Sequence, residues 1–135
     1  QKADKASNAV FYRRVIWQMI TIRQAKKNIE KNKRYWQVQF MDFVDDFRRN
    51  KDLKAVEKPF ALTDRRFDAL LASTIEYLCD EMRLEAPAWV WAVPSLKEPW
   101  FLSGMESLKA IAIVESPVFF RRRKIFVLEN FLYRV

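Results

Sequence analysis

Two pairs of carboxylates have a spacing from which a metal or acid–base site could be built. Asp42 and Asp46 are four residues apart, as are Glu76 and Asp80, so each pair would share one face of a helix. A magnesium site takes carboxylates from separate elements together with a phosphate ligand, so the two helices would have to bring their acids together. We favour the interpretation that these acids, with Asp45, are solvated or salt-bridged, and we expect no metal ion and no cofactor.

The residue inventory excludes most other catalytic chemistry. The 135 residues include no histidine, one cysteine (Cys79) and one glycine (Gly104). Histidine is the only side chain that titrates near pH 7 without perturbation. Neither a Ser-His or Cys-His nucleophile nor a Cys/His zinc site can therefore be built within one chain. Phosphate-binding loops need several glycines, and we expect a protein that is not an enzyme.

The net charge of +8 is unevenly distributed along the chain. Residues 1–34 hold ten Lys and Arg against two Asp and Glu, and residues 117–135 hold five against one. Residues 35–116 hold ten against fourteen, so an acidic middle separates two basic ends. Three interpretations stay open: a surface for nucleic acid or an acidic partner, basic ends that fold back on the middle, and a head-to-tail homodimer.

The best candidate for contact with another protein is a segment rich in tryptophan and proline at residues 86–101. Aromatic and arginine side chains dominate the energetics of protein interfaces, and a dense cationic run follows at residues 121–124. The expected partner-binding residues are Trp89, Trp91, Trp100, Phe101, Arg121, Arg122, Arg123 and Lys124. The alternative is that the aromatic segment covers the core and that the cations are solvated or paired with the acidic middle.

A nucleic-acid-binding module is the second functional hypothesis. Lysine and arginine neutralise phosphates, and aromatic side chains stack on bases. The residues that this hypothesis uses are Arg13, Arg14, Arg23, Lys26, Lys27, Arg121, Arg122 and Arg123. An ordinary amphipathic helix with solvated lysines is the alternative explanation of the N-terminal cations.

Apolar periodicity and the scarcity of glycine predict a mainly α-helical fold. We expect a compact bundle of four to five helices with an irregular Trp/Pro-rich segment. The expected helices are 8–31 with Ser7 as N-cap, 34–50, a third from Thr63 as N-cap to about Arg83, and a fourth from Ser103 to before Pro117. Ser103 and Glu106 have the spacing of a capping box. We divide the chain into a basic N-terminal helical segment, 1–34, and a globular α-helical domain, 35–135.

From about Gln39 onward, several short motifs mark a resemblance. They are residues 43–49 (FVDDFRR), 66–72 (RFDALLA), 76–78 (EYL), 86–89 (APAW), 99–101 (PWF), 116–117 (SP), 119–123 (FFRRR) and 125–127 (IFV). This pattern resembles a family of small uncharacterised bacterial proteins that are encoded beside toxin–antitoxin-type or regulatory genes. The resemblance implies an antitoxin-like or regulatory role and supplies no catalytic residue; residues 1–34 fall outside it.

Cysteine usage and hydropathy suggest a compartment. A single thiol in an apolar pattern suits a reducing cytoplasm, and no signal peptide is visible. The longest apolar runs fall far short of the roughly 20 residues of a membrane span. We expect a non-enzymatic cytoplasmic protein that binds another protein and does not enter a membrane. The first residue is Gln1 rather than methionine, which leaves open that the chain is a fragment of a longer protein.

Overall fold

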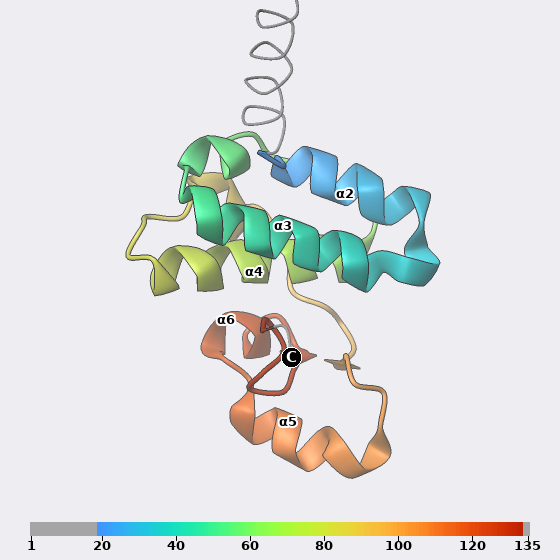
Figure 1. Cartoon of the computed structure of the whole chain (residues 1–135). Coiled ribbons are helices and arrows are strands. Elements are labelled where there is room, and N and C mark those ends of the chain that lie inside the picture. The colour runs from blue at the N-terminus through green and yellow to red at the C-terminus, as the bar shows by residue number, and fades with distance from the viewer. Residues whose placement is uncertain (1–18, 134–135) are drawn as a thin grey trace, which may run out of the picture.

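The structure is a computed structural model that describes residues 19–133, and its architecture is mainly α-helical, as predicted (Figure 1). Within these residues there are five α-helices and two strands of two residues each. The α-helices are α2 (Ile22–Lys31), α3 (Trp36–Asn50), α4 (Arg65–Glu81), α5 (Lys109–Glu115) and α6 (Val118–Arg121). The strands β1 (Trp100–Phe101) and β2 (Ile125–Phe126) pair in parallel.

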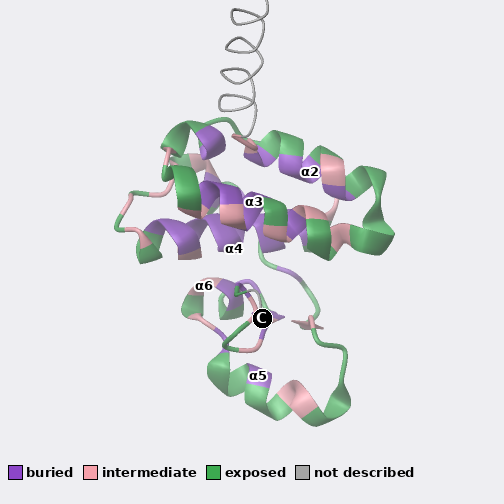
Figure 2. Ribbon diagram, in the orientation of Figure 1, coloured by how far each residue is buried: buried purple, intermediate pink, exposed green. Residues whose placement is uncertain are grey.

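Helix α4 is the centre of the fold. From Phe67 to Cys79 every residue except Tyr77 is buried, so this helix is covered on nearly all sides. Helices α2 and α3 lie together on one side of it, and α6, α5 and the strands lie on the other (Figures 1 and 2). Phenylalanines of α3 and aliphatic side chains of α4 form most of the core between α2, α3 and α4.

The start of α4 differs by one residue from the prediction. The N-cap is Asp64 rather than Thr63, and its carboxylate accepts hydrogen bonds from the backbone N–H groups of Arg66 and Phe67 at 3.1 and 3.3 Å. Both residue types can cap a helix, but a carboxylate also interacts favourably with the positive end of the helix dipole. Thr63 instead donates its hydroxyl hydrogen to Glu30 on α2.

The prediction of one continuous helix over 8–31 is wrong in its described part. Thr21 has extended backbone angles, and its side chain accepts a hydrogen bond from the N–H of Gln24 at 3.1 Å. This side-chain cap starts a separate helix at Ile22. Residues 1–18, with the predicted cap Ser7, lie outside the described residues.

The predicted capping box before α5 is also wrong. Gly104 has a φ of +67°, a left-handed conformation that interrupts a helix, and Met105 is extended. Ser103 accepts only a local hydrogen bond from the N–H of Met105 at 3.4 Å. A short 3-10 helix, η4 (Glu106–Leu108), then leads into α5 at Lys109.

The Trp/Pro-rich segment is largely irregular, but it contains a 3-10 helix, η3 (Ala88–Ala92), directly after Pro87. Two other 3-10 helices, η1 (Lys33–Tyr35) and η2 (Leu53–Val56), connect the longer helices. Although we divided the chain after residue 34, α2 contributes Ile22, Ala25 and Ile29 to the same core as the later helices. Over residues 19–133, every helix is too short or too polar to span a lipid bilayer.

Candidate functional site

Of the four aromatic residues predicted to bind a partner, two pack against the core and a third stacks on the neighbouring strand. The Trp89 indole N–H donates to the carbonyl oxygen of Val56 at 2.8 Å. The Trp100 ring packs edge-on against Phe67, with ring centroids 5.9 Å apart, and lies tilted against Trp36 at 6.3 Å. Phe101 stacks on Phe126 across the two strands. Much of this segment therefore covers the core, which was our alternative interpretation.

Trp91 differs from its neighbours because 62% of its surface is exposed. The Arg122 guanidinium lies over its ring at 4.8 Å from the centroid, in a cation–π geometry. Arg122 also forms an ion pair with the buried Glu76 carboxylate of α4. This second contact fixes the guanidinium from beneath, so Trp91 and Arg122 form a pre-organised pair at the surface.

The predicted cationic run does not face solvent uniformly. Arg123 is 4% exposed, and its guanidinium donates to the carbonyl oxygens of Val90 at 2.8 Å and Val93 at 3.2 Å. It also donates to Ser73 on α4 and forms an ion pair with Glu76 at 2.8 Å. These contacts attach the segment around η3 to α4, so Arg123 stabilises the fold and is not available to a partner.

The remaining two cations of the run are exposed and contact backbone carbonyls. Arg121 donates to the carbonyl oxygen of Ser116 at 2.6 Å, and Lys124 donates to that of Lys97 at 3.2 Å. Lys124 has a φ of 63°, which places it at a tight turn before β2.

Cys79 lies one turn beyond Glu76 on α4 and is buried. Burial, and secondarily the Glu76 carboxylate, raise the pKa of its thiol to about 11. A buried thiol with a raised pKa remains protonated at neutral pH and is a poor nucleophile. Cys79 therefore packs as a residue of the hydrophobic core.

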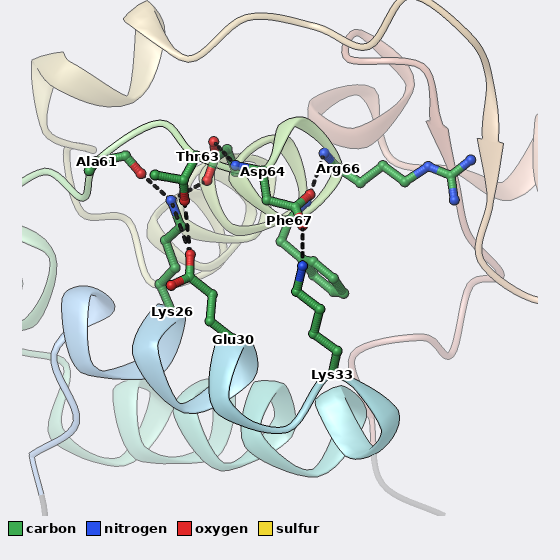
Figure 3. Close-up of polar contacts among 9 residues, drawn as sticks. Lys26, Glu30, Lys33, Ala61, Thr63, Asp64, Arg66 and Phe67 are labelled. Carbon is green, nitrogen blue, oxygen red and sulfur yellow. Dashed lines mark hydrogen bonds and ion pairs between the residues drawn. The ribbon is translucent and has the colours of Figure 1, made fainter.

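Ion pairs from both basic ends converge on α4. Lys26 of α2 lies 2.6 Å from Asp68, and Lys33 lies 3.2 Å from Asp64, as the close-up in Figure 3 shows for Lys33. From the C-terminal side, Arg122 and Arg123 both contact Glu76. Of the three interpretations of the charge distribution, these contacts favour ends that fold back on the acidic middle.

The two carboxylate pairs do not assemble into a cluster. Asp46 is buried, and it accepts hydrogen bonds from the backbone N–H of Ile20 at 2.6 Å and from Arg49 at 2.8 Å. Glu76 is neutralised by arginines, whereas Asp42 and Asp80 are exposed. Nowhere in residues 19–133 do three His, Cys, Asp or Glu side chains come together as metal ligands would.

The cations of the nucleic-acid hypothesis are dispersed. Arg13 and Arg14 lie outside the described residues, and Lys26 is 4% exposed. Arg23 and Lys27 are exposed on α2, which Figure 1 places on the opposite side of α4 from α6 and its arginines. The described cations therefore do not form one continuous strip along which a phosphate backbone could run.

The surface that the sequence analysis missed lies on α5 and the start of α6. We define the α5–α6 surface as Ile111, Ile113, Val114 and Val118, whose exposed fractions are 46%, 48%, 79% and 57%. In α5 only Ala112 is buried, and Figure 2 shows the helix largely exposed. The uninterrupted apolar run from Ala110 to Val114 was the available signal, because one face of such a short helix cannot bury all of it.

The Trp91–Arg122 pair borders this surface. Arg122 follows Val118 by one turn, and its backbone N–H donates to the Val118 carbonyl oxygen at 2.9 Å. The two side chains therefore leave the same side of α6. An aliphatic surface next to an exposed tryptophan and an arginine has the composition of a protein-binding hot spot.

Comparisons of this chain with protein-family models, with curated proteins and with solved structures gave no match. The chain's own geometry is therefore the basis for a proposed function, and the family resemblance stays a prediction.

Proposed function

We propose that this chain is a non-enzymatic interaction protein that binds another protein through the α5–α6 surface. The observation that carries the proposal is the apolar outer face of α5, where Val114 is 79% exposed. Binding is favoured when a partner removes exposed aliphatic surface from water, because this lowers the free energy of the complex. The same short stretch, residues 105–118, holds five of the eleven large apolar side chains exposed among residues 19–133.

The Trp91–Arg122 pair would supply the adjoining polar anchor. Because Glu76 and the Trp91 ring already orient the guanidinium, little side-chain entropy is lost when it meets an acceptor on the partner. An antitoxin-like role and a cytoplasmic location are parts of the same proposal, with support from the sequence resemblance and the cysteine usage respectively.

Capture from native extract, with and without nuclease, tests this function when it is combined with paired variants. We expect Ile111→Gln with Val114→Gln to lower the captured partner by about tenfold or more, since two aliphatic contacts are lost. The matched control is Val38→Gln with Leu62→Gln, two apolar residues that are 53% and 57% exposed elsewhere. The control should retain the partner.

Two results would contradict the proposal. One is a captured protein that disappears after nuclease treatment, or whose capture falls steeply as salt rises, because both are signs of binding through nucleic acid. The other is equal capture by the α5 variant and by its control.

A further inference from the structure

A hollow of about 340 Å³ lies between α2 and the connection that leads to α4. This volume is in the range of small-molecule sites. Its lining residues are Arg23, Lys26, Lys27, Glu30, Pro59, Phe60, Ala61 and Thr63. It is separate from the α5–α6 surface, because α2 and α5 lie on opposite sides of α4 (Figure 1).

The Lys26 ammonium group forms one wall of the hollow. It donates to the Ala61 carbonyl oxygen and lies 2.6 Å from an Asp68 carboxylate oxygen and 4.7 Å from the centre of the Phe60 ring. Figure 3 shows the ammonium group beside Ala61 and Glu30. Asp68 offsets the Lys26 charge, so this pair adds little net charge to the wall.

Glu30, on the same wall, keeps a negative charge that Lys26 offsets only in part, because the Lys26 ammonium is already paired with Asp68. Its carboxylate accepts a hydrogen bond from the Thr63 hydroxyl at 2.9 Å and lies 3.8 Å from the Lys26 ammonium. The acid is therefore turned toward the connection and Lys26. Against this one carboxylate stand two exposed cations of α2, so the net charge at the opening is positive.

Arg23 and Lys27 are those cations, one turn apart on the exposed side of α2. The Arg23 Nε donates to the Pro59 carbonyl oxygen at 2.6 Å, which holds the guanidinium at the rim of the hollow. Two like charges at this spacing repel each other. An anion bound between them would relieve that repulsion, and an arginine fork beside a lysine suits the oxygens and double charge of a phosphate.

We propose that this hollow binds a phosphate group, held by Arg23 and Lys27, with Pro59 and Phe60 beside the rest of the ligand. The phosphate could belong to a small phosphorylated molecule or to a nucleic-acid backbone. The shared chemistry is a phosphate dianion or diester between the two cations. The size of the hollow favours the small molecule as its source.

Titration calorimetry at constant ionic strength tests the proposal with three probes: inorganic phosphate, pyrophosphate and a ten-nucleotide oligothymidylate. We expect the unaltered chain to bind pyrophosphate, and Arg23→Gln with Lys27→Gln to weaken that binding by about tenfold or more. The matched control is Lys54→Gln with Lys97→Gln, which removes the same charge from exposed lysines outside the hollow. Backbone amide NMR shifts at Ala61 and Thr63 should move only with a bound probe.

Each possible result of these titrations either supports or overturns the proposed phosphate site. Binding of phosphate or pyrophosphate that the hollow variant loses and the control keeps supports a small phosphorylated ligand. Stronger binding of the oligonucleotide, with displacement of pyrophosphate, supports the site with nucleic acid as the source. The proposal is overturned if the unaltered chain binds none of the probes, or if the control variant weakens binding as much as the hollow variant.

Discussion

The Arg123 guanidinium lies 2.8 Å from the Glu76 carboxylate, and both side chains are at most 5% exposed. Arg123 also binds two carbonyl oxygens of the segment around η3. A charged pair removed from water gains little net stability by itself, but its separation leaves an uncompensated charge in the core. The pair therefore fixes how the segment around η3 and the C-terminal part of the chain pack on α4.

Removal of the Glu76 charge should destabilise the protein strongly. In Glu76→Gln, the two arginines would face a neutral amide, and breaking a buried pair in this way costs about 3–5 kcal/mol. Urea unfolding followed by circular dichroism measures the change as a lower midpoint. Asp80→Asn, an exposed carboxylate one turn further along α4, is the matched control and should stay within about 0.5 kcal/mol. Equal losses in the two variants would show that Glu76 has no special role.

The Lys26–Asp68 pair allows a test by double substitution. Lys26→Met should cost about 3–5 kcal/mol because Asp68 is left charged inside the protein. Adding Asp68→Asn removes that charge and keeps an oxygen for the hydrogen bond from the Asp64 N–H, so the double variant should recover most of the lost stability. The exposed neighbour Lys27→Met is the control. A double variant less stable than Lys26→Met alone would refute this account of the pair.

Apolar periodicity predicted α3 and α4 well, because the buried face of a helix is determined by the spacing of residues that are close in sequence. The stripes of α3 and α4 have apolar residues three or four positions apart, and these residues form the core. The ends of helices were harder to predict. Thr63 and Asp64 are both good caps, and a glycine such as Gly104 adopts left- and right-handed conformations about equally readily, so its sequence does not say which one it takes.

The partners of the charged residues could not be predicted, because they are distant in sequence. The sequence predicted that Glu76 is solvated or salt-bridged, but it did not show that its partners lie 46 and 47 positions away. The same applies to Lys26 and Asp68. The exposure of the α5 face could not be predicted either, because an apolar run predicts burial unless the surrounding elements are known.

Alkaline pH should destabilise the fold. Burial raises the pKa of Cys79 to about 11, from an ordinary value near 9, and that of Tyr77 to about 12 from near 10. Above pH 9 the unfolded chain releases these protons before the folded one does, so the free energy of unfolding falls as pH rises toward 11 and 12. Below about pH 8 both groups are protonated in the folded and the unfolded state and contribute no pH dependence. Urea midpoints measured from pH 7 to 10.5 provide the test.

Cys79→Ala is the control for this pH dependence, since it removes one of the two titrating groups. The urea midpoint of Cys79→Ala should be lower at pH 7 because the buried side chain is smaller. This midpoint should also fall less steeply between pH 9 and 10.5 than that of the unaltered protein. In the unaltered protein, a disulfide reagent at pH 8 should label Cys79 only after unfolding. Rapid labelling of the folded protein, or parallel pH curves for the two proteins, would contradict the raised pKa.

Substitutions of the two tryptophans of η3 should have different effects, one on stability and the other on partner binding. Trp89→Ala removes the hydrogen bond to Val56 and the packing on Phe60, with ring centroids 5.2 Å apart, and should cost about 3–5 kcal/mol. Trp91→Ala removes an exposed ring whose contact with Arg122 is worth about 0.5–1 kcal/mol. If Trp91 borders the surface that binds the partner, its loss should reduce capture in the nuclease-treated assay while the urea midpoint hardly moves. Capture unchanged in Trp91→Ala would remove the Trp91–Arg122 pair from the proposed interface, whereas a large fall in the urea midpoint would show that Trp91, like Trp89, supports the core.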